Sequence, residues 1–126
     1  MESFNSHSAG GSLQISIDVI EKIARQAAVE VEGVAGVAQP SSIQQNLLGK
    51  LMPNRPIEVT IKDDVADIQV ALAVFYGTKI PEVSEQVQAS VKDAVQSMTN
   101  ISVARVDIVV TGLVANGSTQ NVVEEQ

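Results

Sequence analysis

The stretch that decides the fold is "ADIQVALAVFYGTKIPEVSEQV", residues 66–87. Its first half alternates with a period of two, which is typical of a β-strand with one buried face. Its second half, behind Pro81, changes to valines spaced by four residues, the pattern of an amphipathic helix. The change of period predicts a strand that passes through a short joint into a helix. The strand residues predicted to face the core are Ile68, Val70, Leu72 and Val74.

Upstream of this stretch, "IEVTI" (57–61) alternates in the same way, and "KDDV" (62–65) lies between the two runs. Two alternating runs separated by a short polar turn predict a β-hairpin. The acidic residues Asp63, Asp64 and Asp67 could in principle bind a hard cation, but they lack the glycine and the distal glutamate of a calcium loop. We therefore interpret them as a solvated turn, where aspartate bonds to the local backbone.

Downstream, a helix is predicted from Pro81, which suits a first helical position, to about Thr99. Asn100 can then adopt the left-handed conformation that ends a helix. The residues predicted for its buried stripe are Val83, Val87, Val91, Ala94, Val95 and Met98. A last strand is predicted over 103–114. Its inward residues are expected to be Ala104, Val106, Ile108 and Val110. Because this strand follows a crossover helix, we expect it to run parallel to the strand before that helix.

The first helix is predicted to begin at Ile17 behind a Ser16 cap and to stop near Gly33. Its predicted apolar stripe is Val19, Ile23, Ala27 and Val31, widened by Ile20, Ala24 and Ala28. Two i,i+4 ion pairs are expected on it, Asp18 with Lys22 and Glu21 with Arg25. Residues 34–40 are expected to include a short strand, and 41–56 a short helix or packed loop.

The predicted fold class is a small α+β sandwich, with helices packed on one face of a mixed sheet. Its order is helix, strand, strand, helix, strand, and a short N-terminal strand at 12–16 remains an open option. One domain is expected over 12–114. The polar ends at 1–11 and 115–126 are expected to be disordered tails.

The composition excludes several classes of function. The net charge of −7, with scattered basic residues, argues against nucleic-acid binding. The chain has no cysteine, so disulfides and thiolate chemistry are excluded. The longest strongly apolar run, residues 70–76, is far shorter than the roughly 20 residues that span a bilayer, and the N-terminus does not resemble a signal peptide. We expect a soluble protein inside the cell, without direct membrane insertion.

Catalytic chemistry has little support in the sequence. The chain's one histidine, His7, falls in the predicted tail, away from any partner that would position it. Gly77 stands alone rather than in a phosphate-binding loop, and Glu82 would repel an anion at the helix start. Residues 76–81 are therefore interpreted as a joint rather than a site. We expect no enzyme activity, no catalytic residues, no cofactor and no metal.

Three segments together resemble a known family. They are "EVEGVAGV" (30–37), "YG..IPEV...VQ..V..AV..MT" (76–99) and "V..V.I.V.G" (103–112). The chain is similar in these segments to the alkaline shock proteins, a family of envelope stress response proteins that includes the Gls-type general-stress proteins of Gram-positive bacteria. Asn100 stands where the family often has glycine, and both residues tolerate the left-handed conformation. Segment 41–56 matches no pattern of the family, so no function is carried over to it.

The resemblance implies a cytoplasmic, non-enzymatic scaffold or adaptor of the alkaline or general cell-envelope stress response. It implies self-association into a homo-oligomer and a membrane-anchored partner protein that holds the chain near the membrane. The alternative is a regulatory module that controls a metabolic enzyme, such as one of fatty-acid synthesis. The family supplies no catalytic residues that could be transferred.

A partner surface is predicted on the sheet face away from the helices. The last strand is expected to turn Arg105, Asp107, Val109, Thr111 and Leu113 outward, and its second half is apolar. The candidate surface residues are Ala71, Ala73, Phe75, Val109 and Leu113. An exposed apolar patch of this kind often marks an interaction surface. The alternative is that segment 41–56 folds over it.

Overall fold

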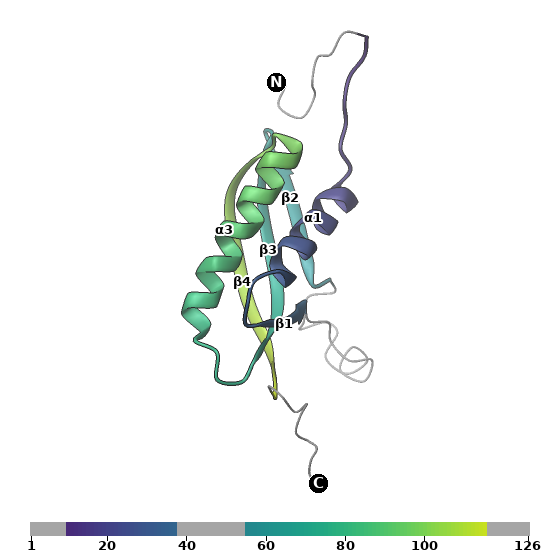
Figure 1. Ribbon diagram of the computed structural model, residues 1–126. Coiled ribbons are helices and arrows are strands. Elements are labelled where there is room, and N and C mark those ends of the chain that lie inside the picture. The colour runs from purple at the N-terminus through teal and green to yellow at the C-terminus, as the bar shows by residue number, and fades with distance from the viewer. Residues whose placement is uncertain (1–9, 38–54, 116–126) are drawn as a thin grey trace.

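The computed structural model describes residues 10–37 and 55–115, which form the predicted α+β structure (Figure 1). The elements are α1 (Ile17–Val29), β1 (Val34–Val37), β2 (Ile57–Lys62), β3 (Val65–Phe75), α3 (Ile80–Thr99) and β4 (Ser102–Val114). The predicted order is confirmed, and β1 is the short strand expected within residues 34–40. Residues 12–16 form no strand. The predicted tails and segment 41–56 lie mainly outside the described residues.

Strand β3 is the centre of the sheet, because it pairs with each of the other three described strands. One of its edges forms a parallel ladder with β4 that runs from the Val65–Ser102 pair to the Phe75–Val114 pair. The other edge is shared by two antiparallel partners, β2 along residues 65–70 and β1 along residues 72–74. The parallel β3–β4 pairing confirms the predicted crossover and makes the sheet mixed.

The β2–β3 hairpin turns through two aspartates, as predicted. Asp63 and Asp64 have φ angles of 56° and 65°, and they separate the paired residues Lys62 and Val65. A two-residue loop with two positive φ angles is the type I′ geometry that matches the twist of paired strands. Asp67 lies in the ladder itself, opposite Thr60, and so is not part of the turn.

Both helices cover the same face of the sheet (Figure 1). α3 packs on β4, α1 packs on β1 and β2, and the two helices contact each other. The core lies between the layers. Its fully buried large side chains are Ile20, Ile68, Val70, Leu72, Val74, Val87, Val91, Val95 and Ile101. The inward residues predicted for β3 are therefore confirmed.

The helix ends follow local capping chemistry. The Val19 N–H donates to the Ser16 side chain at 3.3 Å, which confirms the predicted cap of α1. α1 ends at Val29, and Gly33, with φ of 101°, lies beyond it in the turn into β1. α3 begins at Ile80, one residue before the predicted start, and ends at Asn100 in the left-handed conformation, as predicted.

The predicted helix stripes are partly wrong at their margins. Val19 is 45% exposed and Met98 is 68% exposed, although both were expected in the core. The buried residues of α1 are Ile20, Ala24, Ala27 and Ala28, and those of α3 are Val83, Val87, Val91, Val95 and Thr99. A helix in a single layer can bury only the sides that face the sheet and its neighbour. Val19 and Met98 lie just outside those sides.

Glu21 does not pair with Arg25 as predicted. It accepts a hydrogen bond from Arg55 at 2.8 Å, and this bond raises the pKa of the Arg55 guanidinium above its ordinary value. Arg55 reaches α1 because it closely precedes β2, on which α1 packs. No ion pair joins Asp18 to Lys22 in the described ranges. Contact between distant segments has replaced the expected local pair.

Two bulges in β4 shift its side chains. The first lies where Ala66 pairs with Val103 and Asp67 pairs with Arg105, and the second where Leu72 pairs with Val110 and Ala73 with Gly112. Ala104 is therefore exposed and Val103 is buried, so the predicted inward position of Ala104 is wrong. A bulge adds one residue to a strand and reverses the alternation beyond it.

The outer edge of β4 is covered in part by α3. The Gln96 side chain accepts from the Val103 N–H at 2.9 Å, and the Gln88 side chain donates to the Val106 carbonyl at 3.0 Å. Strand edges expose unpaired backbone groups that attract other strands. The two glutamines therefore protect the first half of this edge.

Candidate functional site

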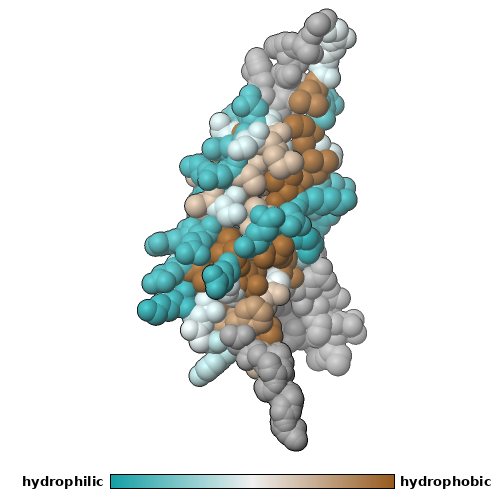
Figure 2. Space-filling view, viewed as in Figure 1, coloured by the Kyte–Doolittle hydropathy of each residue, from teal (hydrophilic) through white to brown (hydrophobic). Residues whose placement is uncertain are grey.

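The surface that stands out is a groove between α1 and α3 on the solvent side of the helix layer. Its volume is about 440 Å³. The lining residues are Val19, Lys22, Ile23, Gln26, Ala27, Glu30, Ser90, Ala94 and Met98. Figure 2 shows hydrophobic surface on this side of the molecule between bands of hydrophilic side chains. The groove is the candidate interaction site.

The floor of the groove is narrow because the two helices are joined by small residues. The Ser90 hydroxyl donates to the Ala27 carbonyl at 3.0 Å, which ties α3 to α1 at one end of the groove. Ala94 follows one turn later on α3, and its short side chain leaves the space above it open. Small side chains at a helix contact allow close approach but do not fill the surface beside it.

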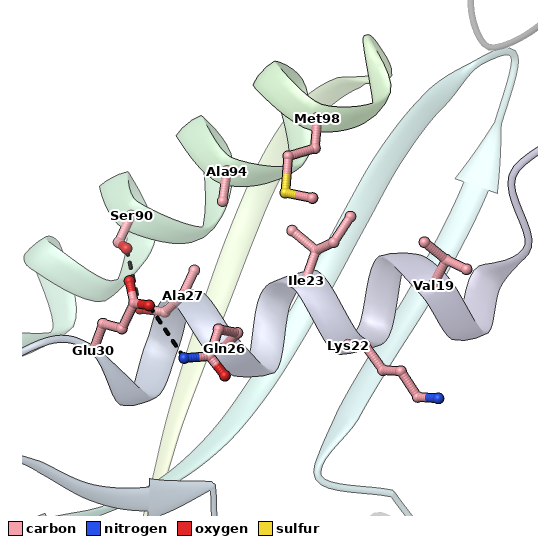
Figure 3. A pocket seen from close by; sticks show the side chains of 9 residues that line it. All are labelled: Val19, Lys22, Ile23, Gln26, Ala27, Glu30, Ser90, Ala94 and Met98. Atoms are coloured by element: carbon pink, nitrogen blue, oxygen red, sulfur yellow. Dashed lines mark hydrogen bonds between the residues drawn. The ribbon is translucent and has the colours of Figure 1, made fainter.

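The walls of the groove are longer apolar side chains from both helices. Met98 points from α3 toward Ile23 of α1, and Val19 stands one turn before Ile23 (Figure 3). Met98 and Val19 are both exposed, and Ile23 is half-buried. Methionine adapts its shape readily, so Met98 can accommodate a partner's side chains. This arrangement provides contact area rather than chemistry.

The rim of the groove on α1 carries the polar residues. Lys22, Gln26 and Glu30 follow one another at four-residue spacing, and all three are exposed. The Gln26 amide donates to the Glu30 carboxylate at 3.1 Å. Nothing on the rim brings a nucleophile beside a base, and the Ser90 hydroxyl is already bonded to backbone. In the described ranges, no three acidic or histidine side chains gather as a metal site.

The joint at residues 76–79 is made of backbone contacts. The Tyr76 N–H donates to the Val114 carbonyl at 2.8 Å, and the Thr78 N–H donates to the Phe75 carbonyl at 3.1 Å. Gly77 has a φ angle of 95°, and Lys79 precedes α3 without a capping bond from its side chain. These contacts fit the interpretation of this stretch as a connection between β3 and α3.

The predicted outer-face residues do not all share one face. Ala71 pairs with Val109 on the outer face, but the second bulge places Leu113 opposite the buried Val74, on the helix side. Val114, opposite Phe75, takes the outer position that was expected for Leu113. Ala71 is buried, Ala73 and Phe75 are half-buried, and Val109 and Leu113 are exposed. Their role as a partner surface stays a prediction.

The groove was not predicted from the sequence. Its one signal was the width of the apolar stripes, because Val19 and Met98 extend each stripe beyond what a single helix layer buries. His7 lies outside the described residues. None of the helices in the part of the chain that the structure describes is long and apolar enough to cross a membrane.

Comparison with known proteins gives consistent matches. A model of the alkaline shock protein family, described as having a cell envelope-related function, matches residues 5–115. The Bacillus subtilis protein YloU is 35% identical over 106 residues, covering 82% of this chain and 88% of YloU. YqhY of the same organism is 31% identical over 115 residues, covering 89% and 84%. Spy1535 of Streptococcus pyogenes is 37% identical over 111 residues, covering 83% and 81%.

Among solved structures, one titled MamM-CTD H264A superposes with a TM-score of 0.50 at 12% sequence identity. The match covers 77% of this chain and 98% of that one. At this identity the likeness concerns the fold alone.

Proposed function

This chain belongs to the alkaline shock protein family, whose function is cell envelope-related, and on that premise we propose that it is a non-enzymatic scaffold or adaptor of the cell-envelope stress response. It acts through protein–protein contacts, and the groove between α1 and α3 is its principal contact surface. The family match agrees with the resemblance drawn from residues 30–37 and 76–112.

The observation that carries the proposal is the exposure of apolar side chains along the groove. Val19 and Met98 leave much of their surface in water beside the half-buried Ile23. A partner that covered them would gain about 1.5–3 kcal/mol for each fully buried side chain, before the costs of association. The polar rim of Lys22, Gln26 and Glu30 can orient that partner.

The same site supports contact better than catalysis. Its lining offers one hydroxyl, that of Ser90, which is bonded to the Ala27 carbonyl. Its charged side chains, Lys22 and Glu30, are exposed on the rim rather than buried near a reacting centre. Catalytic carboxylates and amines usually need burial or close partners to shift their pKa.

The proposal places the protein in the cytoplasm, close to the membrane through a membrane-anchored partner. The acidic chain would not approach an anionic lipid surface unaided, because its net charge is −7. The partner protein supplies the attachment, and the groove or the outer sheet face supplies the contact.

The test is complementation in a strain that lacks this gene, under alkaline or cell-wall stress. Met98→Glu adds a charge to the groove at an exposed position, where little folding stability is at stake. Ala89→Glu is the matched control, because Ala89 is also exposed on α3 but lies on the flank toward β4. We expect the Ala89 variant to restore survival and the Met98 variant to fail. Full rescue by a folded Met98→Glu protein would contradict the proposal.

A further inference from the structure

The order of charges along α1 carries information about what occupies the groove. Lys22 and Glu30 lie eight residues apart on the same rim, with Gln26 midway between them. At a rise of about 1.5 Å per residue, opposite charges are separated by about 12 Å along the helix. In the described ranges Lys22 has no ion pair, and Glu30 is bonded to Gln26 alone.

We propose that the occupant of the groove is a second copy of this chain, docked with its α1 antiparallel to the first about a two-fold axis at Gln26. This inference rests on the proposed function and names the partner at the same site. A two-fold interface brings residue i against j and j against i. With Gln26 on the axis, Lys22 of each copy faces Glu30 of the other.

The apolar side chains fit the same arrangement. An axis at Gln26 places Ile23 of one copy near Val29 of the other, because their numbers are equally distant from 26. Val29 is 38% exposed although it belongs to an otherwise well-packed helix. Met98 flanks Ile23 and would join the same covered strip. The arrangement therefore covers exposed residues of α1 that the monomer leaves wet.

Other occupants match the charge order less well. A second copy docked parallel would place Lys22 against Lys22 and Glu30 against Glu30, and like charges at an interface are strongly unfavourable. An unrelated helix could fill the apolar floor, but it gives no reason for opposite charges at equal distances from a central amide. The antiparallel copy satisfies both charges with the residues the chain already has.

The experiment uses charge reversal at the two positions. Lys22→Glu and Glu30→Lys are prepared separately in the full chain, and both sites are exposed, so folding should be retained. Circular dichroism confirms the fold. Sedimentation equilibrium over a concentration series measures self-association of the wild type, of each variant alone and of a fluorescently labelled Lys22→Glu protein mixed with Glu30→Lys. Ala89→Glu is the control for added negative charge.

Each single reversal opposes like charges twice in the two-fold dimer, so its dissociation constant should rise at least about tenfold. The mixture should recover association, because a Lys22→Glu copy facing a Glu30→Lys copy has both pairs complementary. Variants that associate as the wild type does, or a mixture that fails to recover, would overturn the inference. A wild type that stays monomeric would also overturn it. In that case a Met98→Glu protein that still fails in cells would leave the proposed function standing with a different partner.

Discussion

A Cβ atom added to Gly33 would lie 2.9 Å from Cγ2 of Val83, so the turn after α1 packs directly against the first turn of α3. Thr78 of the β3–α3 joint lies on the same side, at 3.1 Å from that position. The contact fixes one end of the helix pair, while the Ser90–Ala27 hydrogen bond fixes its middle. The spacing of α1 and α3, and so the width of the groove, depends on both.

This contact predicts different costs for two glycines of similar backbone conformation. Gly33 and Gly77 have φ angles of 101° and 95°, but a Cβ on Gly77 would meet nothing within 4 Å. Gly77→Ala should lower the free energy of unfolding by about 1–2 kcal/mol, from backbone strain alone. Gly33→Ala should cost about 1–3 kcal/mol more, because the methyl group must displace Val83. Urea unfolding of both variants measures the difference, and equal costs would show that the Gly33 packing contributes little.

The left-handed end of α3 predicts a second pair of outcomes. Asn100 has φ of 65° and is exposed, so its backbone conformation can be tested without disturbing the core. Asn100→Gly should leave stability within about 0.5 kcal/mol of the wild type. Asn100→Val should lower it by about 1–2 kcal/mol, because a branched side chain clashes in this conformation. Thermal and urea melts decide, and a neutral valine would mean that the helix end rearranges.

Direct lipid binding is not expected. The chain carries a net charge of −7, and the exposed part of its groove is apolar but bordered by Glu30. Anionic membranes attract basic amphipathic segments rather than acidic ones. The purified protein should therefore stay in the supernatant when anionic vesicles are sedimented at physiological salt. Appreciable co-sedimentation would remove the need for a membrane-anchored partner.

The outer sheet face gives a test that separates interaction from packing. Val109 and Val114 share this face, whereas Leu113 lies on the helix side, opposite Val74. If the face binds a partner, Val109→Lys with Val114→Lys should keep the melting temperature and lose assembly or partner contact. If another part of the chain covers the face, the same change should lower the melting temperature and leave assembly intact. Leu113→Lys, also exposed, is the control on the opposite face.

Much of the fold followed from local patterns in the sequence. The period of two in 66–75, the turn at Asp63 and Asp64, and the caps at Ser16 and Asn100 each reflect interactions within a few residues. The bulges of β4 could not be predicted in the same way. They arise from pairing with β3, and they reversed the faces of Ala104 and Leu113.

The candidate site was also hidden from the sequence for a physical reason. An apolar stripe shows that a helix has a buried side, but its margins depend on how closely the neighbouring helix approaches. That approach is set by the Ser90–Ala27 bond and the Gly33–Val83 contact, which join residues distant in the chain. Val19 and Met98 are therefore indistinguishable from core residues until both helices are placed.

The most direct test of the groove as an interaction surface is crosslinking through an introduced cysteine in living cells. The chain has no cysteine of its own, so Gln26→Cys supplies a single thiol, and Ala89→Cys supplies the matched control on the other flank of α3. With a short thiol–thiol crosslinker, Gln26→Cys should give a homodimer band at twice the mass of the chain, and Ala89→Cys should give little. A homodimer band from Ala89→Cys without one from Gln26→Cys would contradict the groove as the contact between copies.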